Sequence, residues 1–337
     1  MNKNKFIKWF AAILTTLVFA YLVGPVPPKF SLNEKIDKMN NIQLDSLEMM
    51  INKNEQSVPS IKEDNQARII WYDSTKKEKT PYSIVYLHGF TGSQMDGSPA
   101  HIEFAKRYGC NLYLARLYGH GIESDNPLLD LTPENYFESA KEAVRIGEQL
   151  GDKVIIMATS TGGTLALPIA ADNPEIAGLI LYSPNIDVYD KASFILTKPW
   201  GLQIAKLVKG GDFITSDDPP IIQKYWQTKY RVEAAVTLKS LINAEMTEKT
   251  FAKVHQPVFV GYYYKNDREQ DHTVSVKRIL EMFNELGTPD SLKRKVAFPG
   301  VGAHPIACSL VSKDVPHVLD ETYKFAEEVL HLTPVIK

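Results

Sequence analysis

The chain has 337 residues, of which 44% are hydrophobic and 23% are charged, and its formal net charge is −2. This composition excludes a wholly disordered chain, and the missing basic excess argues against a nucleic-acid partner. The sequence has two cysteines, Cys110 and Cys308, which excludes a disulfide framework and a cysteine-rich zinc site.

The amino-terminal 30 residues have the pattern of a membrane-targeting segment. Lysines precede an uncharged run from Trp9 to Val23, and a stiff Gly-Pro-Val-Pro-Pro linker follows at 24–28. Residues 6–26 would span about 31 Å as a helix, which is enough to cross a bilayer if the Lys8 side chain extends to the lipid headgroups. Because no small-residue cleavage site follows, we predict an uncleaved membrane anchor over 1–30. The basic flank places the body outside the cytoplasm, in the periplasm of a bacterium; secretion after removal of a signal segment is the alternative.

A polar arm at 31–65 is expected to join this segment to a body at 66–335. In the body, apolar runs alternate with helical patterns, which is typical of a mostly parallel sheet with helices on both faces. One helix is expected to start at Thr132-Pro133, an N-cap followed by a proline at the first helical position. The predicted strands are 68–72, 82–87, 111–117, 154–158, 177–184, 257–264 and 292–298.

The alternation of strands and helices breaks between residues 185 and 255. This stretch has no strand pattern, but it contains helical segments with aromatic residues near 200–208 and 225–242. A helical insert at this point is expected to lie over the carboxyl edge of the sheet as a cap, where it would enclose a substrate pocket and exclude water.

One short stretch organises the predicted body, because strand 154–158 ends in small residues and an alanine- and leucine-rich helical pattern follows at once. Ser160 stands at the apex of this turn, where its hydroxyl would project above the sheet edge. The run Ala158-Thr159-Ser160-Thr161-Gly162 resembles the nucleophile elbow of α/β-hydrolases, normally G-x-S-x-G, with alanine in place of the first glycine. The resemblance implies an α/β-hydrolase fold with Ser160 as its nucleophile.

A second part of the resemblance lies after strand 82–87, which runs directly into the sequence His-Gly-Phe-Thr-Gly. In α/β-hydrolases this loop and the residue after the nucleophile each donate a backbone N–H group to the oxyanion hole. The resemblance therefore assigns these two donors to Phe90 and Thr161. His88, and His120 in a later Gly-His-Gly loop, are expected to shape their loops rather than to act as bases.

The other two catalytic residue types follow in the order that the family uses. Hydrolases of this kind carry the triad acid after the strand that follows the insert, which is strand 257–264 in this sequence. Asp271 fits their Asp-x-x-Val pattern, whereas Asp267 and Asp187 are weaker candidates. His304 lies in a glycine-containing loop after the last strand, as the catalytic histidine of the family does. The order Ser160, Asp271, His304 is that of the α/β-hydrolase triad.

These residues predict a carboxylic ester hydrolase similar to the carboxylesterase and monoacylglycerol-lipase branch, with a small acyl or lipid-like ester as substrate. A serine hydroxyl needs a base within hydrogen-bond reach, an imidazole titrates near neutral pH, and a buried carboxylate fixes the tautomer of that imidazole. The mechanism requires no metal or organic cofactor. Two alternatives stay open. One is a serine aminopeptidase-like amidase, whose substrate amino group would meet Asp212, Asp217 or Asp218; the other is a non-catalytic binding protein.

Overall fold

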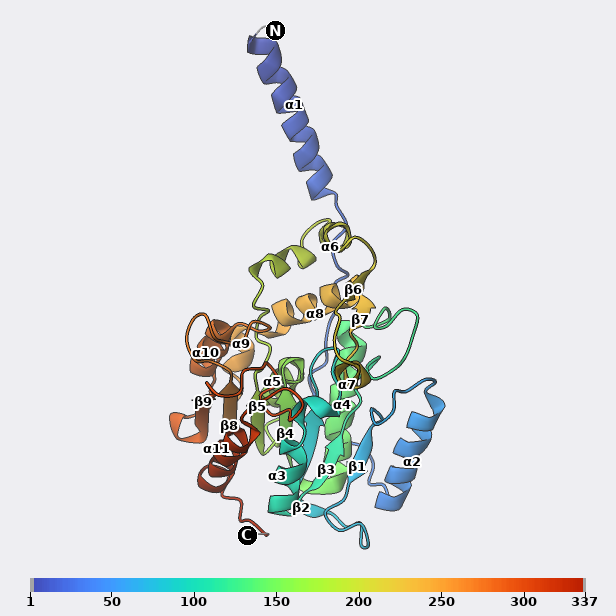
Figure 1. Cartoon of the computed structure of the whole chain (residues 1–337), viewed down its shortest axis with the longest axis vertical. Helices are drawn as coiled ribbons and strands as arrows, with labels where there is room; N and C mark the ends of the chain where they lie inside the picture. Colours follow the sequence, from blue (N-terminus) through green and yellow to red (C-terminus); the bar gives the residue numbers. More distant parts are fainter. Residues whose placement is uncertain (1–2, 336–337) are drawn as a thin grey trace.

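The computed structural model describes residues 3–335, and a seven-stranded sheet forms its centre (Figure 1). The strands lie in the order β1-β3-β2-β4-β5-β8-β9, and every neighbouring pair is parallel except β1 and β3. The predicted mostly parallel sheet is therefore confirmed. Its strands are β1 (Arg68–Ile70), β2 (Thr80–Leu87), β3 (Asn111–Leu114), β4 (Gly151–Thr159), β5 (Gly178–Tyr182), β8 (Val258–Tyr262) and β9 (Lys293–Ala297).

The middle strands are buried on both faces, which explains their unbroken apolar sequences. In β4, Ile155 and Met157 belong to a core that includes residues of α3 (Ala100–Tyr108) and α11 (Val315–Glu328). Ile156 and Ala158 belong to a separate core on the side of α4 (Pro133–Leu150) and α5 (Thr161–Asp172). Because successive side chains of a strand point to opposite faces, helices cover both faces of the sheet, as predicted.

Helix α4 begins at the residue that the sequence indicates. The Thr132 hydroxyl accepts a hydrogen bond from the Asn135 N–H at 3.2 Å, and the Asn135 side chain accepts one from the Thr132 N–H at 2.9 Å. Pro133 occupies the first turn, where its missing N–H costs no intrahelical hydrogen bond. This reciprocal cap satisfies two of the N–H groups that a helix start leaves without partners.

Part of the segment before the sheet packs against the sheet and its helices. Helix α2 (Leu44–Ser57) buries Leu47 and Ile51 in the same core as α4. Its Glu55 forms an ion pair with Arg116 at 2.7 Å, and both side chains are largely buried. A buried pair of this kind is costly to break, because the remaining charge would stay desolvated without a partner.

The stretch between β5 and β8 carries the expected helices. Figure 1 shows α6, α8 and the β6–β7 pair beyond one end of the central sheet, on the side from which α1 projects. Strands β6 and β7 have three residues each and pair antiparallel, which is too short for a period-two pattern to stand out in the sequence. The elements are η2 (Lys191–Thr197), α6 (Gly201–Lys209), β6 (Phe213–Thr215), α7 (Pro220–Tyr225), β7 (Lys229–Arg231), α8 (Val232–Glu245) and α9 (Glu248–Phe251). The remaining elements are η1 (Gln94–Gly97), α10 (Val276–Glu285) and η3 (Asp290–Leu292).

The predicted membrane anchor is wrong. Its residues form α1 (Lys3–Leu22), which projects from the body in Figure 1, but none of the helices within residues 3–335 is long and apolar enough to cross a membrane. Lysines occupy its first two turns, so the uncharged run from Trp9 to Val23 extends about 22 Å as a helix, short of the roughly 30 Å hydrocarbon layer. The membrane partner and the extracytoplasmic location inferred from this segment, by anchor or by cleaved signal, therefore have no support.

Candidate active site

Ser160 forms the sharp turn between β4, which ends at Thr159, and α5, which begins at Thr161. Its φ of 53° is in the left-handed region, which costs a non-glycine residue roughly 1–3 kcal/mol. Backbone hydrogen bonds hold this conformation. The Ser160 N–H donates to the Tyr182 carbonyl, and the Ser160 carbonyl accepts from the Asn185 N–H, both at 2.9 Å. The neighbouring strand end therefore fixes the strained turn from both sides.

Two glycines allow α5 to lie against the strand ends. A Cβ atom on Gly162 would come within 2.0 Å of the Leu87 carbonyl oxygen, and one on Gly163 within 2.7 Å of Pro184 Cβ. Neither position has room for a side chain. The alanine that replaces the first glycine of the motif, Ala158, is fully buried, and its single methyl group fits in this environment.

His304 and Asp271 lie in direct contact, although 33 residues separate them in the chain. His304 Nδ1 is 2.6 Å from Asp271 Oδ2, while Asp271 Oδ1 accepts hydrogen bonds from the N–H groups of Thr273 and Val274 at 2.8 and 3.1 Å. Burial acts to raise the pKa of Asp271, but His304 and these N–H groups outweigh it and hold the pKa below its ordinary value. The carboxylate therefore stays ionised behind the imidazole.

The second ring nitrogen of His304, Nε2, is not occupied by a hydrogen bond to another described residue. This atom is also buried. A buried polar atom without a partner is unfavourable in a folded protein, and such atoms are frequent where a substrate or a reacting group completes the site. Nε2 is therefore the ring atom that a nucleophile or a substrate would meet.

The other two candidate acids lie elsewhere. The exposed carboxylate of Asp267 accepts a hydrogen bond from the Tyr264 hydroxyl at 2.9 Å, and Asp187 pairs with Lys239 of α8. Neither of them is hydrogen-bonded to His304 within the part of the chain that the structure describes. The structure therefore brings Asp271, and not the two alternatives, to the imidazole.

Ser160 and His304 open onto one pocket of about 350 Å³, which Phe90 and Thr161 also line. Two ionisable side chains, Asp96 and Lys239, also line this pocket. Most of the apolar lining comes from the stretch between β5 and β8, through Val188, Leu196, Trp226, Tyr230, Ala235 and Leu238. This stretch therefore forms the apolar wall that faces the strand ends.

The loop after β2 is held in place by a histidine. His88 is fully buried; its Nδ1 lies 2.9 Å from the Gly89 carbonyl oxygen, and its Nε2 accepts the Leu117 N–H at 3.1 Å. Burial lowers the pKa of His88 to about 4, so the ring is neutral at physiological pH. These contacts fit the expected loop-shaping role, and they keep Phe90 at the pocket.

Sequence reasoning missed Asp96 of η1, a buried acid that lines the pocket. Its side chain is buried, with only 2% of the residue exposed, and it accepts the Gly89 N–H at 2.7 Å and the Tyr86 hydroxyl. Burial raises its pKa to about 7, against the lowering effects of Tyr86, Gly89 and the nearby His304. A signal was available, because Asp96 is the only acidic or basic residue, histidine aside, between His88 and Ile102.

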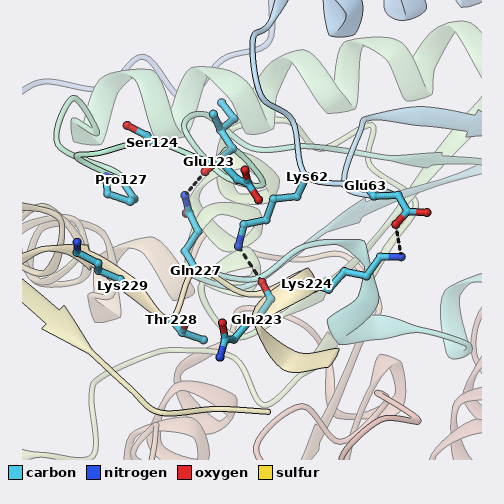
Figure 2. Close-up of a pocket in the computed structure, with 11 residues that line it drawn as sticks. Lys62, Glu63, Glu123, Ser124, Pro127, Gln223, Lys224, Gln227, Thr228 and Lys229 are labelled. Carbon is cyan, nitrogen blue, oxygen red and sulfur yellow. Dashed lines mark hydrogen bonds and ion pairs between the residues drawn. The ribbon is translucent and has the colours of Figure 1, made fainter. Parts of the chain in front are cut away.

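A second pocket, of about 480 Å³, lies apart from the elbow, between the segment before β1 and the β7 side of the insert (Figure 2). Lys62 Nζ donates to the backbone oxygens of Gln223 and Trp226 at 2.8 and 3.0 Å, and Lys224 pairs with Glu63 at 3.1 Å. None of its described lining residues is a histidine or a cysteine. Its polar groups tie the insert to the body and form no nucleophile–base pair.

Comparison with known proteins agrees with this geometry. Residues 84–315 match the sequence profile of the alpha/beta hydrolase family, a stretch that contains the elbow, Asp271 and His304. The chain belongs to the alpha/beta hydrolase family. The matched stretch makes up more than half of this alpha/beta hydrolase and includes all of the sheet from β4 to β9.

Individual relatives of this alpha/beta hydrolase include a thermostable monoacylglycerol lipase from Bacillus sp. (strain H-257). The two sequences are 29% identical over 111 residues, which cover 33% of this chain and 44% of the lipase. The match therefore spans less than half the length of that curated relative.

Solved structures of lipolytic enzymes share the fold of this alpha/beta hydrolase. A metagenome-derived lipolytic enzyme from work on LipS and LipT has a TM-score of 0.63 at 18% identity, over 79% of this chain and 98% of that one. The Saccharomyces cerevisiae monoglyceride lipase, solved as a soluble variant, has a TM-score of 0.58 at 14% identity, over 80% of this chain and 92% of that one. The monoacylglycerol lipase of Paleococcus ferrophilus has a TM-score of 0.56 at 14% identity, over 79% of this chain and 98% of that one. Identities this low establish a shared fold.

Proposed function

We propose that this protein is a serine hydrolase that cleaves carboxylic esters through an acyl-enzyme. The observation that carries the proposal is that His304, which is paired with the buried Asp271, lines the same pocket as Ser160. A serine hydroxyl becomes a useful nucleophile only beside a base, and an imidazole backed by a carboxylate is suited to that role. The strained backbone of Ser160 supports it further, because such strain is concentrated at functional sites.

In the proposed reaction, Ser160 Oγ attacks the ester carbonyl carbon while its proton passes to His304 Nε2. The carbonyl oxygen becomes an oxyanion, which the N–H groups of Phe90 and Thr161 would stabilise. Thr161 is the first residue of α5, so its N–H has no intrahelical acceptor and lies at the positive end of the helix dipole. His304 returns the proton to the leaving alkoxide, and water then releases the acyl group by the same steps.

The pocket supports an acyl or lipid-like ester as the substrate. Its walls are mostly apolar, and at about 350 Å³ it is large enough to enclose a short acyl chain. We infer that residues 185–255, an insert within the body at 66–335, act as a cap over the pocket, because this stretch supplies most of the apolar lining. The relatives of lipase and esterase type, including the monoacylglycerol lipase from Bacillus, point to the same substrate class.

An amidase that binds a substrate amino group has less support. Asp212 pairs with Lys206 and Arg231, and the Asp218 carboxylate accepts from Ser216. None of Asp212, Asp217 and Asp218 is among the described residues that line the pocket of Ser160. The acidic groups that this alternative requires are therefore used elsewhere or lie away from the pocket.

Hydrolysis of p-nitrophenyl butyrate by the wild type and by Ser160→Ala tests the proposal. We expect kcat to fall by about 10⁴-fold or more, since removing the nucleophile leaves only binding and oxyanion stabilisation. The variant should fold normally, which circular dichroism would check. A folded variant with activity close to that of the wild type would exclude Ser160 as the nucleophile.

A further inference from the structure

Asp96 is an unusual carboxylate, because it is buried beside the pocket of Ser160 without a basic partner. It lines the same pocket as Ser160 and His304. No lysine or arginine forms an ion pair with it within residues 3–335. A buried acid without a cation is unfavourable unless its hydrogen bonds compensate. The contacts of Asp96 therefore indicate what it does.

The two oxygens of Asp96 connect the two halves of the proposed oxyanion hole. Oδ2 accepts the N–H of Gly89, the residue immediately before Phe90, at 2.7 Å. Oδ1 accepts the hydroxyl of Tyr86, which lies 2.8 Å from the Thr159 hydroxyl in a second hydrogen bond. Thr159 immediately precedes Ser160. One carboxylate thus links the loop after β2 to the end of β4.

The loop wraps closely around this carboxylate. The Gly92 N–H donates to the Gly89 carbonyl at 3.1 Å, which closes a turn over residues 89–92. A Cβ atom on Gly89 would lie 3.0 Å from Asp96 Oδ2 and 3.1 Å from Ser160 Cβ, and one on Gly92 would lie 2.9 Å from Asp96 Oδ2. The loop therefore has little freedom to shift while the carboxylate is in place.

We propose that Asp96 is a positioning residue that holds the loop so that the Phe90 N–H points at the developing oxyanion. This inference rests on the proposed function, since it concerns the oxyanion of that reaction. Above pH 7, where most Asp96 side chains are ionised, the carboxylate suits the role because its hydrogen bonds to N–H donors are shorter and stronger than those of a neutral acceptor. It accepts from both partners at once without rotating. Oxyanion donors act only when they are oriented in advance, so a loosened loop would weaken transition-state binding more than substrate binding.

The test compares Asp96→Leu, which has no acceptor, with Asp96→Asn, whose amide oxygen still accepts the Gly89 N–H. We expect the leucine variant to lose roughly 10- to 100-fold in kcat for p-nitrophenyl butyrate with KM nearly unchanged, which is less than the loss of a whole oxyanion donor. We expect the asparagine variant to recover most of that loss. Asp290→Leu makes the same change on an almost fully exposed side chain and serves as the control.

A second readout separates positioning from general destabilisation. In a trifluoromethyl ketone complex, Ser160 Oγ adds to the ketone carbon, its proton passes to His304, and the carbonyl oxygen becomes an oxyanion. The Ki of the butyl trifluoromethyl ketone should rise in Asp96→Leu by the same factor as kcat falls, while the Ki of butyramide, which forms no oxyanion, stays constant. A change in folding stability alone would not produce this contrast.

The possible outcomes are distinct. Asp96→Leu with wild-type kcat and ketone affinity would overturn the positioning role, and so would an equal weakening of the ketone and butyramide. If the leucine variant does not fold, Asp96→Ser, whose side chain is too short to reach Gly89, makes the same comparison. Failure of the proposed function itself would look different, because the wild type would then neither hydrolyse the ester nor bind the ketone.

Discussion

At the scale of single residues, the position of Asp271 behind His304 gives the most direct prediction. Asp271→Asn keeps the size of the side chain but removes the charge that, in the proposed mechanism, fixes the tautomer of the imidazole and stabilises the imidazolium. We expect kcat for p-nitrophenyl butyrate to fall by about 10³- to 10⁴-fold. Steady-state kinetics at neutral pH measure this loss.

Asp267→Asn is the matched control, because it makes the same change four residues away on an exposed loop. We expect its kcat to stay within about twofold of the wild type, as for most exposed substitutions. Equal losses in the two variants, or a larger loss in Asp267→Asn, would contradict the assignment of Asp271 as the triad acid.

The sequence predicted Asp271 as a site residue but not Asp96. The resemblance to the family favoured Asp271 through its Asp-x-x-Val pattern, and the structure shows the local basis of that pattern, since the Asp271 side chain accepts the N–H groups of Thr273 and Val274. Asp96 has no such local signature. Its partners, Gly89 and Tyr86, are brought to it by the way in which the loop folds back on β2, and a linear pattern does not contain that information.

At the scale of elements, the close approach of α5 to the end of β2 predicts a strong effect of one methyl group. Gly162→Ala would place Cβ within 2.0 Å of the Leu87 carbonyl oxygen. Because that neighbour is backbone and cannot rotate away, the helix or strand has to shift. We expect the free energy of unfolding to fall by about 2–4 kcal/mol, measured by urea denaturation.

Gly211→Ala provides the comparison, since nothing lies within 4 Å of the added methyl group. We expect it to change the free energy of unfolding by less than about 1 kcal/mol. The change can be an increase, because alanine restricts the unfolded chain more than glycine does. Similar stabilities of the two variants would mean that the tight packing behind the elbow is not as the structure describes.

Elements were predicted well where the sequence pattern was long and apolar. Strands β2, β4, β5 and β8 are largely buried, so their runs of apolar residues are conspicuous. The small residues after β4 indicated the sharp turn at Ser160. The pair β6–β7 was missed, because three residues are too few to show an alternation. In helix α2 only Leu47 and Ile51 are buried, which is too few apolar positions to give a strong helical pattern in the sequence.

At the scale of the whole molecule, the family and the fold agree with the sequence expectation, whereas the expected membrane anchor does not. The expected span of residues 6–26 required Lys8 to reach the lipid headgroups, and the uncharged run that follows Lys8 is too short to cross a bilayer by itself. The side chains of α1 from Ile7 to Leu22 are nevertheless exposed, among them Trp9 and Phe19 at 70% and 64%. Helix α1 therefore contributes little to the core that supports the site, which depends on the sheet and its flanking helices.

The proposed active site depends on the whole fold, because its three central groups come from the end of β4, the loop after β8 and the loop after β9. A fluorophosphonate tests their convergence in a single measurement. Ser160 Oγ would displace fluoride at phosphorus only when a base and oxyanion donors surround it. We predict that mass spectrometry of the labelled protein finds the phosphonate on Ser160 alone, and that His304→Ala suppresses the labelling. No labelling of the folded wild type, or labelling of a different serine, would contradict the account.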